Sequence, residues 1–113
     1  MHEYSIVQAM FDTIEATARQ NHAVAVKRVH VRVGSGAGVD VSLLRTAYDT
    51  FRVHTICDDA PIEIEEIPLR WTCPDGHGDM TPGRPLSCPA CGRAARLAEG
   101  DELILDRLEL EVA

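Results

Sequence analysis

A chain of 113 residues, 45% of them hydrophobic, is long enough for one domain with a modest core and a small appendage. Its formal charge of −7 would repel a phosphate backbone, and one Trp, two Tyr and two Phe are too few to stack against single-stranded bases, so we expect no nucleic-acid partner. No stretch approaches membrane-spanning length and no secretory signal opens the chain, so we expect a soluble cytoplasmic protein with no membrane partner.

The first predicted element is a helix from about Ser5 to about Asn21. Apolar residues recur there at helical spacing, and Ser5 with Gln8 three residues later forms a capping box. A strand is predicted next over residues 29–33, where three valines alternate with polar side chains. Val24 and Val26 are out of phase with those valines, which indicates a bulge or a late strand start nearby.

Asp40 is expected to cap a second helix after a glycine-rich run. The apolar face of this helix consists of Leu43, Leu44, Ala47, Tyr48 and Phe51. We expect it to end between Thr55 and Pro61, and residues 62–65 then alternate as a second strand. Strand, helix and strand in this order predict a βαβ unit with parallel strands.

Between Trp71 and Gly100 the composition changes to Pro, Gly, Cys and Asp, over a stretch too long for an ordinary loop. Residues 103–105 and 108–112 then resume strand character, as one bulged strand or two short ones. We therefore predict an α+β fold in which a small mixed sheet of about three strands, including the βαβ unit, packs against two helices. Residues 1–69 plus 101–113 would form this domain, and residues 70–100 an inserted zinc-ribbon-like lobe.

Within this lobe, Cys88 and Cys91 have the spacing of a zinc knuckle, in which two thiolates three residues apart lie on a tight turn. Gly92 would relieve the backbone of the turn so that amides can face the sulfurs. Because no signal peptide is present, these cysteines indicate a metal site rather than a disulfide framework.

Two thiolates do not complete a tetrahedron, and the matching half-site is expected at Cys73. Gly76 stands where a second cysteine would belong, and His77 follows it. Asp75, Asp79 or water are alternatives to His77 as the fourth ligand. We predict a closed structural zinc site formed by Cys73, His77, Cys88 and Cys91.

A second candidate site lies at the first three residues, where Met1, His2 and Glu3 place an α-amine, an imidazole and a carboxylate within one short reach. The amine, the imidazole and the intervening backbone amides can form a planar nitrogen set, which suits Ni(II) or Cu(II) better than zinc. The alternatives are a solvated chain end and, for Glu3, a favourable interaction with the dipole of the first helix.

Other motifs do not predict chemistry. The glycines at 34, 36 and 38 lack the spacing of a dinucleotide-binding loop, and Asp40 puts a negative charge where a phosphate would lie. Cys57 is expected to be a small buried hydrophobic residue. The histidines without a metal-spaced partner are His22, His30 and His54. No nucleophile, base and orienting acid can be assembled, so we expect no enzyme.

Five segments carry a family resemblance: Met1-His2-Glu3-Tyr4-Ser5, Val31-Arg32-Val33-Gly34 ahead of Gly38-Val39-Asp40, Ile62-Glu63-Ile64-Glu65-Glu66, and Cys88-Pro89-Ala90-Cys91-Gly92. With these, the chain resembles the HypA/HybF family of hydrogenase maturation proteins over essentially its whole length. The resemblance implies a nickel chaperone, not itself a catalyst, that helps insert Ni(II) into the large subunit of nickel–iron hydrogenase. It also implies that the chaperone works with the GTPase HypB and, in some organisms, supplies nickel to urease.

By that resemblance the nickel ligands are the amine of Met1, the side chain of His2, and the amides of His2 and Glu3. The zinc ligands that it implies are Cys73, Cys88 and Cys91. The chain departs from the family's usual pair of Cys-x-x-Cys half-sites at Gly76, so His77 as the fourth Zn(II) ligand is our own inference. The competing hypothesis is a zinc-ribbon adaptor that binds other proteins and has no nickel role, and a zinc enzyme is disfavoured because a closed thiolate site leaves no position for water.

Overall fold

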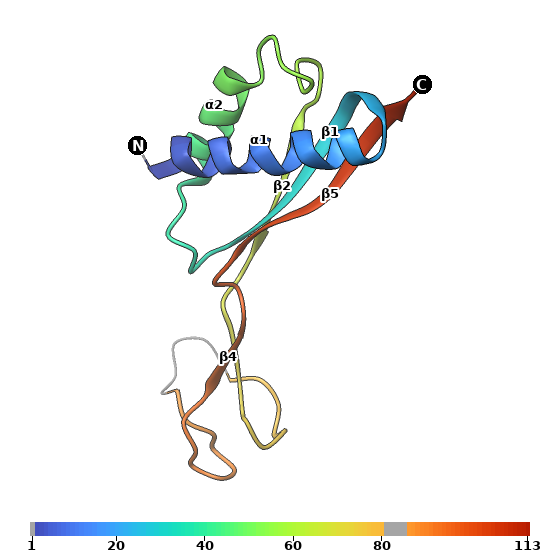
Figure 1. The fold of residues 1–113 in the computed structure, drawn as a ribbon. Helices are drawn as coiled ribbons and strands as arrows, with labels where there is room; N and C mark the ends of the chain where they lie inside the picture. Colours follow the sequence, from blue (N-terminus) through green and yellow to red (C-terminus); the bar gives the residue numbers. More distant parts are fainter. Residues whose placement is uncertain (1, 81–85) are drawn as a thin grey trace.

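The computed structural model describes residues 2–80 and 86–113, and of His2 it describes the backbone alone. The elements, in chain order, are α1 (His2–Gln20), β1 (Ala23–Gly34), α2 (Val41–Phe51), β2 (Ile62–Ile67), β3 (Arg70–Thr72), β4 (Arg96–Glu99) and β5 (Leu103–Val112). They form a three-stranded sheet with two helices and, apart from it, a two-stranded sheet (Figure 1).

The larger sheet has the strand order β2-β1-β5. β1 and β2 are parallel, with Val29 opposite Ile62, and α2 connects them, so the predicted βαβ unit is confirmed. β5 pairs antiparallel with β1 on the other side, which makes the sheet mixed. The α+β fold with a small mixed sheet and two helices is thus as predicted.

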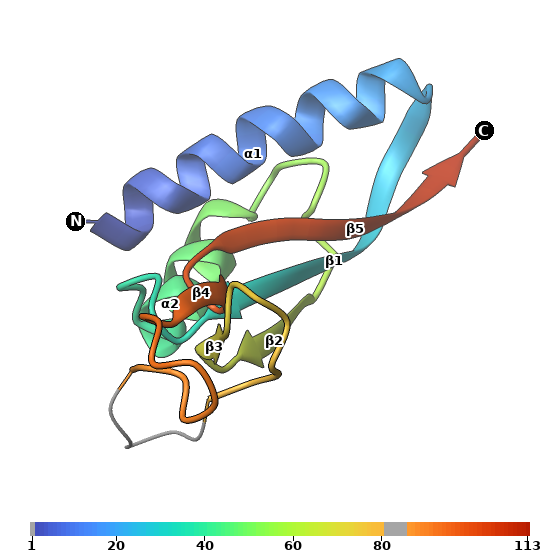
Figure 2. The same cartoon turned by 90° about the horizontal axis from the view of Figure 1, so that it is seen from below.

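One face of this sheet carries the hydrophobic core. Val29, Val31 and Val33 are 0–2% exposed, and they lie in one cluster with residues of both helices, including Ile14 and Tyr48. Burying a valine or isoleucine side chain fully contributes roughly 1.5–3 kcal/mol, so the alternation read from the sequence is what attaches the helices to this face. Figure 1 shows α1 crossing β1 and β5, and Figure 2 shows it on one side of these strands.

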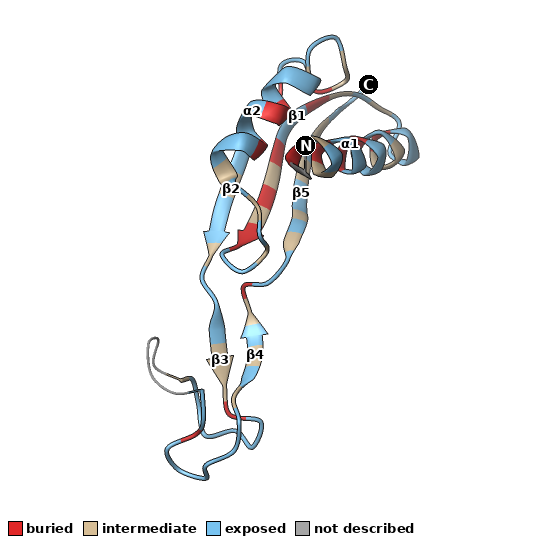
Figure 3. Cartoon of the chain, turned by 90° about the vertical axis from the view of Figure 1, so that its left-hand side faces the viewer, coloured by how far each residue is buried: buried red, intermediate tan, exposed pale blue. Residues whose placement is uncertain are grey.

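The opposite face of the sheet is charged. Arg28 forms an ion pair with Glu63, and the His30 imidazole contacts the Glu109 carboxylate. These pairs link neighbouring strands, and Figure 3 shows buried segments in red alternating with tan and pale blue ones along β1, the central strand. Because the side chains are exposed or half-buried, each ion pair contributes no more than about 1 kcal/mol.

Both predicted irregularities of the sheet are present. The pairing of β1 with β5 shifts register between Val26 and Arg28, where the valine phase changes in the sequence. A second shift falls between His30 and Val31, opposite Asp106. Residues 103–112 therefore form one strand with a bulge rather than two short strands, which settles an alternative that the sequence left open.

The predicted ends of the helices are partly wrong. α1 begins at His2, not near Ser5, and the acidic side chain of Glu3 lies in its first turn, where the helix dipole favours it. α2 ends at Phe51, before the expected range, and the chain continues as a turn. In that turn the Thr55 hydroxyl donates to the Arg52 carbonyl at 2.6 Å, and His54 has a positive φ of 63° that no helix tolerates.

The two-stranded sheet of β3 and β4 lies at the far end of the molecule, whose extents are 56 × 28 × 17 Å. Figures 1 and 3 show it hanging below the larger sheet on two chain segments. We call residues 70–100 the lobe, and the remainder the main domain. Among the residues that the structure describes, no helix is long and apolar enough to cross a bilayer.

Candidate metal centre

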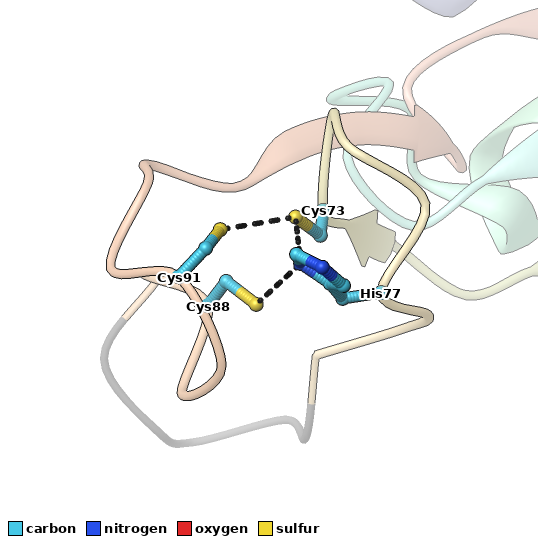
Figure 4. A group of neighbouring side chains, drawn as sticks. All are labelled: Cys73, His77, Cys88 and Cys91. Atoms are coloured by element: carbon cyan, nitrogen blue, oxygen red, sulfur yellow. Dashed lines mark hydrogen bonds between the residues drawn. The ribbon is translucent and has the colours of Figure 1, made fainter.

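Four side chains of the lobe converge on one point (Figure 4). The ligand atoms of Cys73, His77, Cys88 and Cys91 all lie within 4.8 Å of one another. Within residues 2–80 and 86–113, this is the one group of three or more Cys, His, Asp or Glu side chains close enough to share a metal ion. The sequence-predicted zinc residues are thus brought together.

The downstream half of the cluster is a knuckle at residues 88–92. The Gly92 amide donates to the Cys88 carbonyl at 2.7 Å, and Gly92 has a φ of 74°, a conformation that favours glycine. The turn points the amide of Ala90 at the Cys88 sulfur at 3.4 Å. The predicted role of Gly92 is therefore confirmed, and the knuckle presents the sulfur with a ready hydrogen-bond donor.

The upstream half is a loop closed at both ends by backbone hydrogen bonds. The Cys73 amide donates to the Gly78 carbonyl at 3.0 Å, and the Gly76 amide donates to the Cys73 carbonyl at 3.1 Å. Gly76 and Gly78 have φ values of 83° and 95°, so glycine on each side of His77 allows the chain to reverse. The reversal turns the His77 ring back toward Cys73 (Figure 4).

The spacing of these atoms fits a tetrahedral ion. The Cys73 and Cys91 sulfurs are 3.6 Å apart, and His77 Nδ1 lies 3.4 Å from the Cys73 sulfur and 3.6 Å from that of Cys88. Around Zn(II), with bonds of about 2.3 Å to sulfur and about 2.0 Å to nitrogen, tetrahedral edges are about 3.8 Å between sulfurs and about 3.6 Å between sulfur and nitrogen. These three distances are close to the tetrahedral edges, and the remaining ligand atoms lie within 4.8 Å of one another, so the four side chains are arranged to converge on one ion.

The electrostatics of the cluster favour a thiolate at Cys73. Desolvation acts to raise the pKa of this thiol, but hydrogen bonds from the backbone amides of Asp75 and His77, with the neighbouring thiols, lower its pKa to about 6. At Cys91 the hydrogen bond from the Arg93 amide acts to lower the pKa of the thiol. Desolvation and the adjacent Cys73 and Cys88 sulfurs together outweigh it, so the pKa of Cys91 is raised. One of the two facing thiols thus ionises readily, which is the form that binds metal.

The two carboxylates considered as alternative ligands have other partners. Asp75 accepts a hydrogen bond from Arg93 at 2.9 Å, and Asp79 forms an ion pair with Arg70 at 3.1 Å. The Asp75 carboxylate lies 4.0 Å from the Cys91 sulfur, at the edge of the cluster. The geometry therefore favours His77 as the fourth donor.

At the chain start the structure describes less. Met1 lies outside the described residues, and the His2 side chain is not described, so the predicted nickel donors there stay a prediction. Glu3 is 8% exposed, and its carboxylate accepts a hydrogen bond from the Asp40 amide at 3.2 Å. Sequence reasoning did not predict that Asp40 is a neighbour of Glu3, because no local pattern signals a contact between residues 37 positions apart.

The remaining candidates occupy structural positions. Cys57 is fully buried beside Tyr48, as expected for a small hydrophobic residue. Asp40 caps α2, since its carboxylate accepts from the Leu43 amide at 3.1 Å. Of the three glycines, Gly34 and Gly36 lie against Gly100 of the lobe, whereas a Cβ on Gly38 would meet nothing within 4 Å.

Fold and site together define a class: a small α+β domain from which a lobe with three cysteines and one histidine, arranged to hold a metal ion, projects. Comparison with known proteins identifies the family. Residues 1–110 match the family described as hydrogenase/urease nickel incorporation, metallochaperone, HypA. The chain belongs to the HypA family.

Individual relatives agree with this. The hydrogenase maturation factor HypA of Shewanella baltica (strain OS223) is 40% identical over 98% of this chain and 97% of its own length. That of Desulfitobacterium hafniense (strain DSM 10664 / DCB-2) is 32% identical over 98% and 99%. The solution structure of the Ni metallochaperone HypA from Helicobacter pylori matches with a TM-score of 0.72 at 29% identity over 98% of both chains, and a second HypA solution structure with a TM-score of 0.79 at 30% identity over 100% and 98%.

Proposed function

We propose that this chain carries Ni(II) for hydrogenase maturation, binding it at the free N-terminus while Zn(II) holds the lobe in shape. Ni(II) is the cargo, and Zn(II) is a resident ion. The observation that supports the carrier role most is the match of residues 1–110 to a nickel-incorporation family. The chain then acts as a carrier and not as a catalyst.

The nickel donors in this proposal are the Met1 amine, the His2 imidazole and the backbone amides of His2 and Glu3. The first amides of a helix have no acceptor within the helix, and α1 begins at His2, so these two amides are not used by helical hydrogen bonds. Four nitrogens at a chain end suit the square-planar geometry of Ni(II). Since the Glu3 carboxylate is engaged with the Asp40 amide, only the backbone of Glu3 is assigned to the metal.

Delivery requires a site that can be vacated. Donor atoms at a chain end can detach from a metal ion one at a time, so the ion can pass to an acceptor. A closed cage cannot release its ion in this way. We propose that the acceptor is the large subunit of a nickel–iron hydrogenase, that a HypB-type GTPase takes part, and that this occurs in the cytoplasm. The family's description in terms of hydrogenase/urease nickel incorporation supports a hydrogenase as the acceptor, and the GTPase and the compartment rest on the resemblance alone.

The lobe's site is proposed to be structural. The Zn(II) ligands would be Cys73, His77, Cys88 and Cys91, which fill all four positions and leave none for water or substrate. Three thiolates and one imidazole at this spacing support a structural zinc ion rather than a catalytic metal ion. Its binding free energy then stabilises a lobe that has almost no apolar core of its own.

The alternative is a protein-interaction adaptor in which the zinc lobe docks to partners and the N-terminus is inert. The projection of the lobe away from the main domain favours it (Figure 1). The two functions differ in what they require of Met1, because only the carrier needs an unblocked amine.

The test is a calorimetric titration of Ni(II) into three tag-free proteins saturated with Zn(II): the native chain, His2→Ala, and a chain with two residues added before Met1. The carrier role predicts one strong site in the native chain and its loss in both variants. Equal nickel binding in all three would remove the N-terminal site, and unchanged zinc content in each would show that the lobe is intact.

A further inference from the structure

The chain passes between the main domain and the lobe at two segments, residues 67–69 and residues 99–102, and we call the junction of these segments the neck. The turn at the end of β1, residues 34–36, is hydrogen-bonded to both segments. Its amides donate from Gly34 to Glu102, from Ser35 to Ile67 and from Gly36 to Gly100, each at 2.8 Å. In return the Leu69 amide donates to the Ser35 hydroxyl oxygen at 3.1 Å.

At the neck the backbones approach so closely that there is no room for a side chain at Gly34 or Gly100. A Cβ on Gly34 would lie 2.2 Å from the Gly100 carbonyl oxygen, and a Cβ on Gly100 would lie 2.4 Å from that of Pro68. Gly100 also has a φ of 101°, which favours glycine in any case. Gly34 lies at the end of a strand with no such requirement, so its lack of a side chain serves the contact with Gly100 alone.

The ion pairs between domain and lobe are weaker restraints. Arg32 on β1 reaches Glu99 on β4 at 3.3 Å, with side chains 35% and 40% exposed, and Arg70 shares the same carboxylate. A pair this exposed is screened by solvent and contributes little. The backbone at the neck is the firmer restraint, because Gly36 donates directly to Gly100 of the lobe and the other three hydrogen bonds hold residues 67, 69 and 102, which lead into and out of the lobe.

We propose that the turn at residues 34–36 fixes the orientation of the lobe relative to the main sheet, and we call this turn the seat. The lobe is then not a freely tethered appendage. Its Cys/His cluster is presented at one angle to whatever the main domain engages, and the angle is set by main-domain residues. A cavity of about 170 Å³, lined by Arg32, Ile67 and Glu99 among others, lies beside the neck and leaves room for the lobe to tilt if the seat is altered. This inference does not depend on nickel binding.

The test variant is Gly34→Ala. Its methyl must gain about 1 Å from the Gly100 carbonyl, and since paired strands lie about 4.8 Å apart, such a wedge at the neck tilts the lobe by on the order of 10°. The control is Gly38→Ala in the same loop, whose methyl would meet nothing within 4 Å, so that its φ of 73° adds backbone strain without a clash at the neck. Ser35→Ala removes the acceptor of the Leu69 amide and adds no bulk.

The measurement is of amide residual dipolar couplings in the full-length, Zn(II)-saturated chain. In the native protein and in Gly38→Ala, couplings from the lobe strands and from the main sheet should fit one common alignment tensor. In Gly34→Ala the lobe should keep its internal couplings but fit a tensor rotated by on the order of 10°. In Ser35→Ala its couplings should shrink relative to those of the sheet.

Three results would overturn the proposal. The native chain could require separate tensors for lobe and sheet, which would mean a loose tether. Gly34→Ala could retain the native lobe orientation. Should Gly34→Ala fail to fold, Ser35→Ala decides, and unchanged lobe couplings in that variant would refute the seat.

Discussion

The residue that we infer to be the fourth Zn(II) ligand is also the one around which the upstream loop is built. His77 lies between two glycines with positive φ, so its ring turns back onto Cys73 from the position after the one a second cysteine would occupy. Sequence spacing suggested this ligand but left two aspartates open. What argues against them is their pairing with Arg70 and Arg93, contacts across 9 and 18 positions that no local pattern encodes.

The first prediction concerns the fourth ligand. His77→Ala should weaken Zn(II) binding by more than about 100-fold, because loss of even an outer partner of a ligand costs 10- to 100-fold. Asp79→Ala, which breaks only the ion pair with Arg70, is the control and should bind zinc as the native chain does. Competition with a chromophoric chelator measures both. Weak binding by Asp75→Ala with normal binding by His77→Ala would transfer the role to the aspartate.

A second residue-scale prediction concerns Tyr48 and Cys57. Burial raises the pKa of both groups above their ordinary values of about 10 and about 9. Their contribution to the free energy of unfolding is fully present below those ordinary values and is lost as pH rises through the raised folded values, since the unfolded chain ionises first. Stability should therefore fall above about pH 9.

Tyr48→Phe tests this. The hydroxyl donates to the Ala60 carbonyl at 2.7 Å, and Arg52 also donates to that oxygen, so the loss at neutral pH should be only about 1 kcal/mol. The decline in alkaline solution should be shallower than in the native chain. Urea unfolding across the alkaline range measures it, with Tyr4→Phe as control. A slope equal to the native one would contradict the assignment.

At the scale of elements, the sequence predicted periodicity better than ends. Alternating valines identified β1, its bulge and its buried face, because a half-buried strand has a strict period of two. The start of α1 was placed too late because Ser5 has the form of a cap, whereas Glu3 and its contact with Asp40 hold the earlier turn. The end of α2 depends on the left-handed His54, a conformation with no sequence signature beyond glycine.

The cap of α2 gives the element-scale prediction. Asp40→Ala should lower the free energy of unfolding by about 1 kcal/mol, because the carboxylate satisfies the Leu43 amide at the helix start. Asp40→Asn should keep most of this stability. Both variants retain the backbone amide that donates to Glu3, so the N-terminal contact is not tested by them. Ser42→Ala, two residues further along in the first turn of α2, is the control. A comparable loss of stability in that variant would argue against capping as the cause.

At the scale of the whole molecule, two regions are stabilised in different ways. The hydrophobic core draws its described members from the main domain, and in residues 70–80 and 86–100 the buried side chains are Cys73 and Cys88. A segment that buries so little apolar surface cannot offset its ordering entropy of roughly 1–2 kcal/mol per residue. We propose that residues 70–100 fold as a unit only with a metal, and that residues 1–69 plus 101–113 fold without one.

Chelation tests this division with a reporter that the chain already carries. Trp71, the single tryptophan, is half-buried on β3, so its fluorescence follows the lobe, whereas far-ultraviolet circular dichroism follows α1 and α2 of the main domain. Structural zinc in small sites supplies about 10–16 kcal/mol of folding free energy. Removing it with a strong chelator should therefore shift Trp71 emission to that of solvent-exposed indole while the helical signal stays near its native value, and restored Zn(II) should reverse the change. Simultaneous loss of both signals would show that the metal stabilises one cooperative unit, and an unchanged emission would show that the lobe stays folded without its ion.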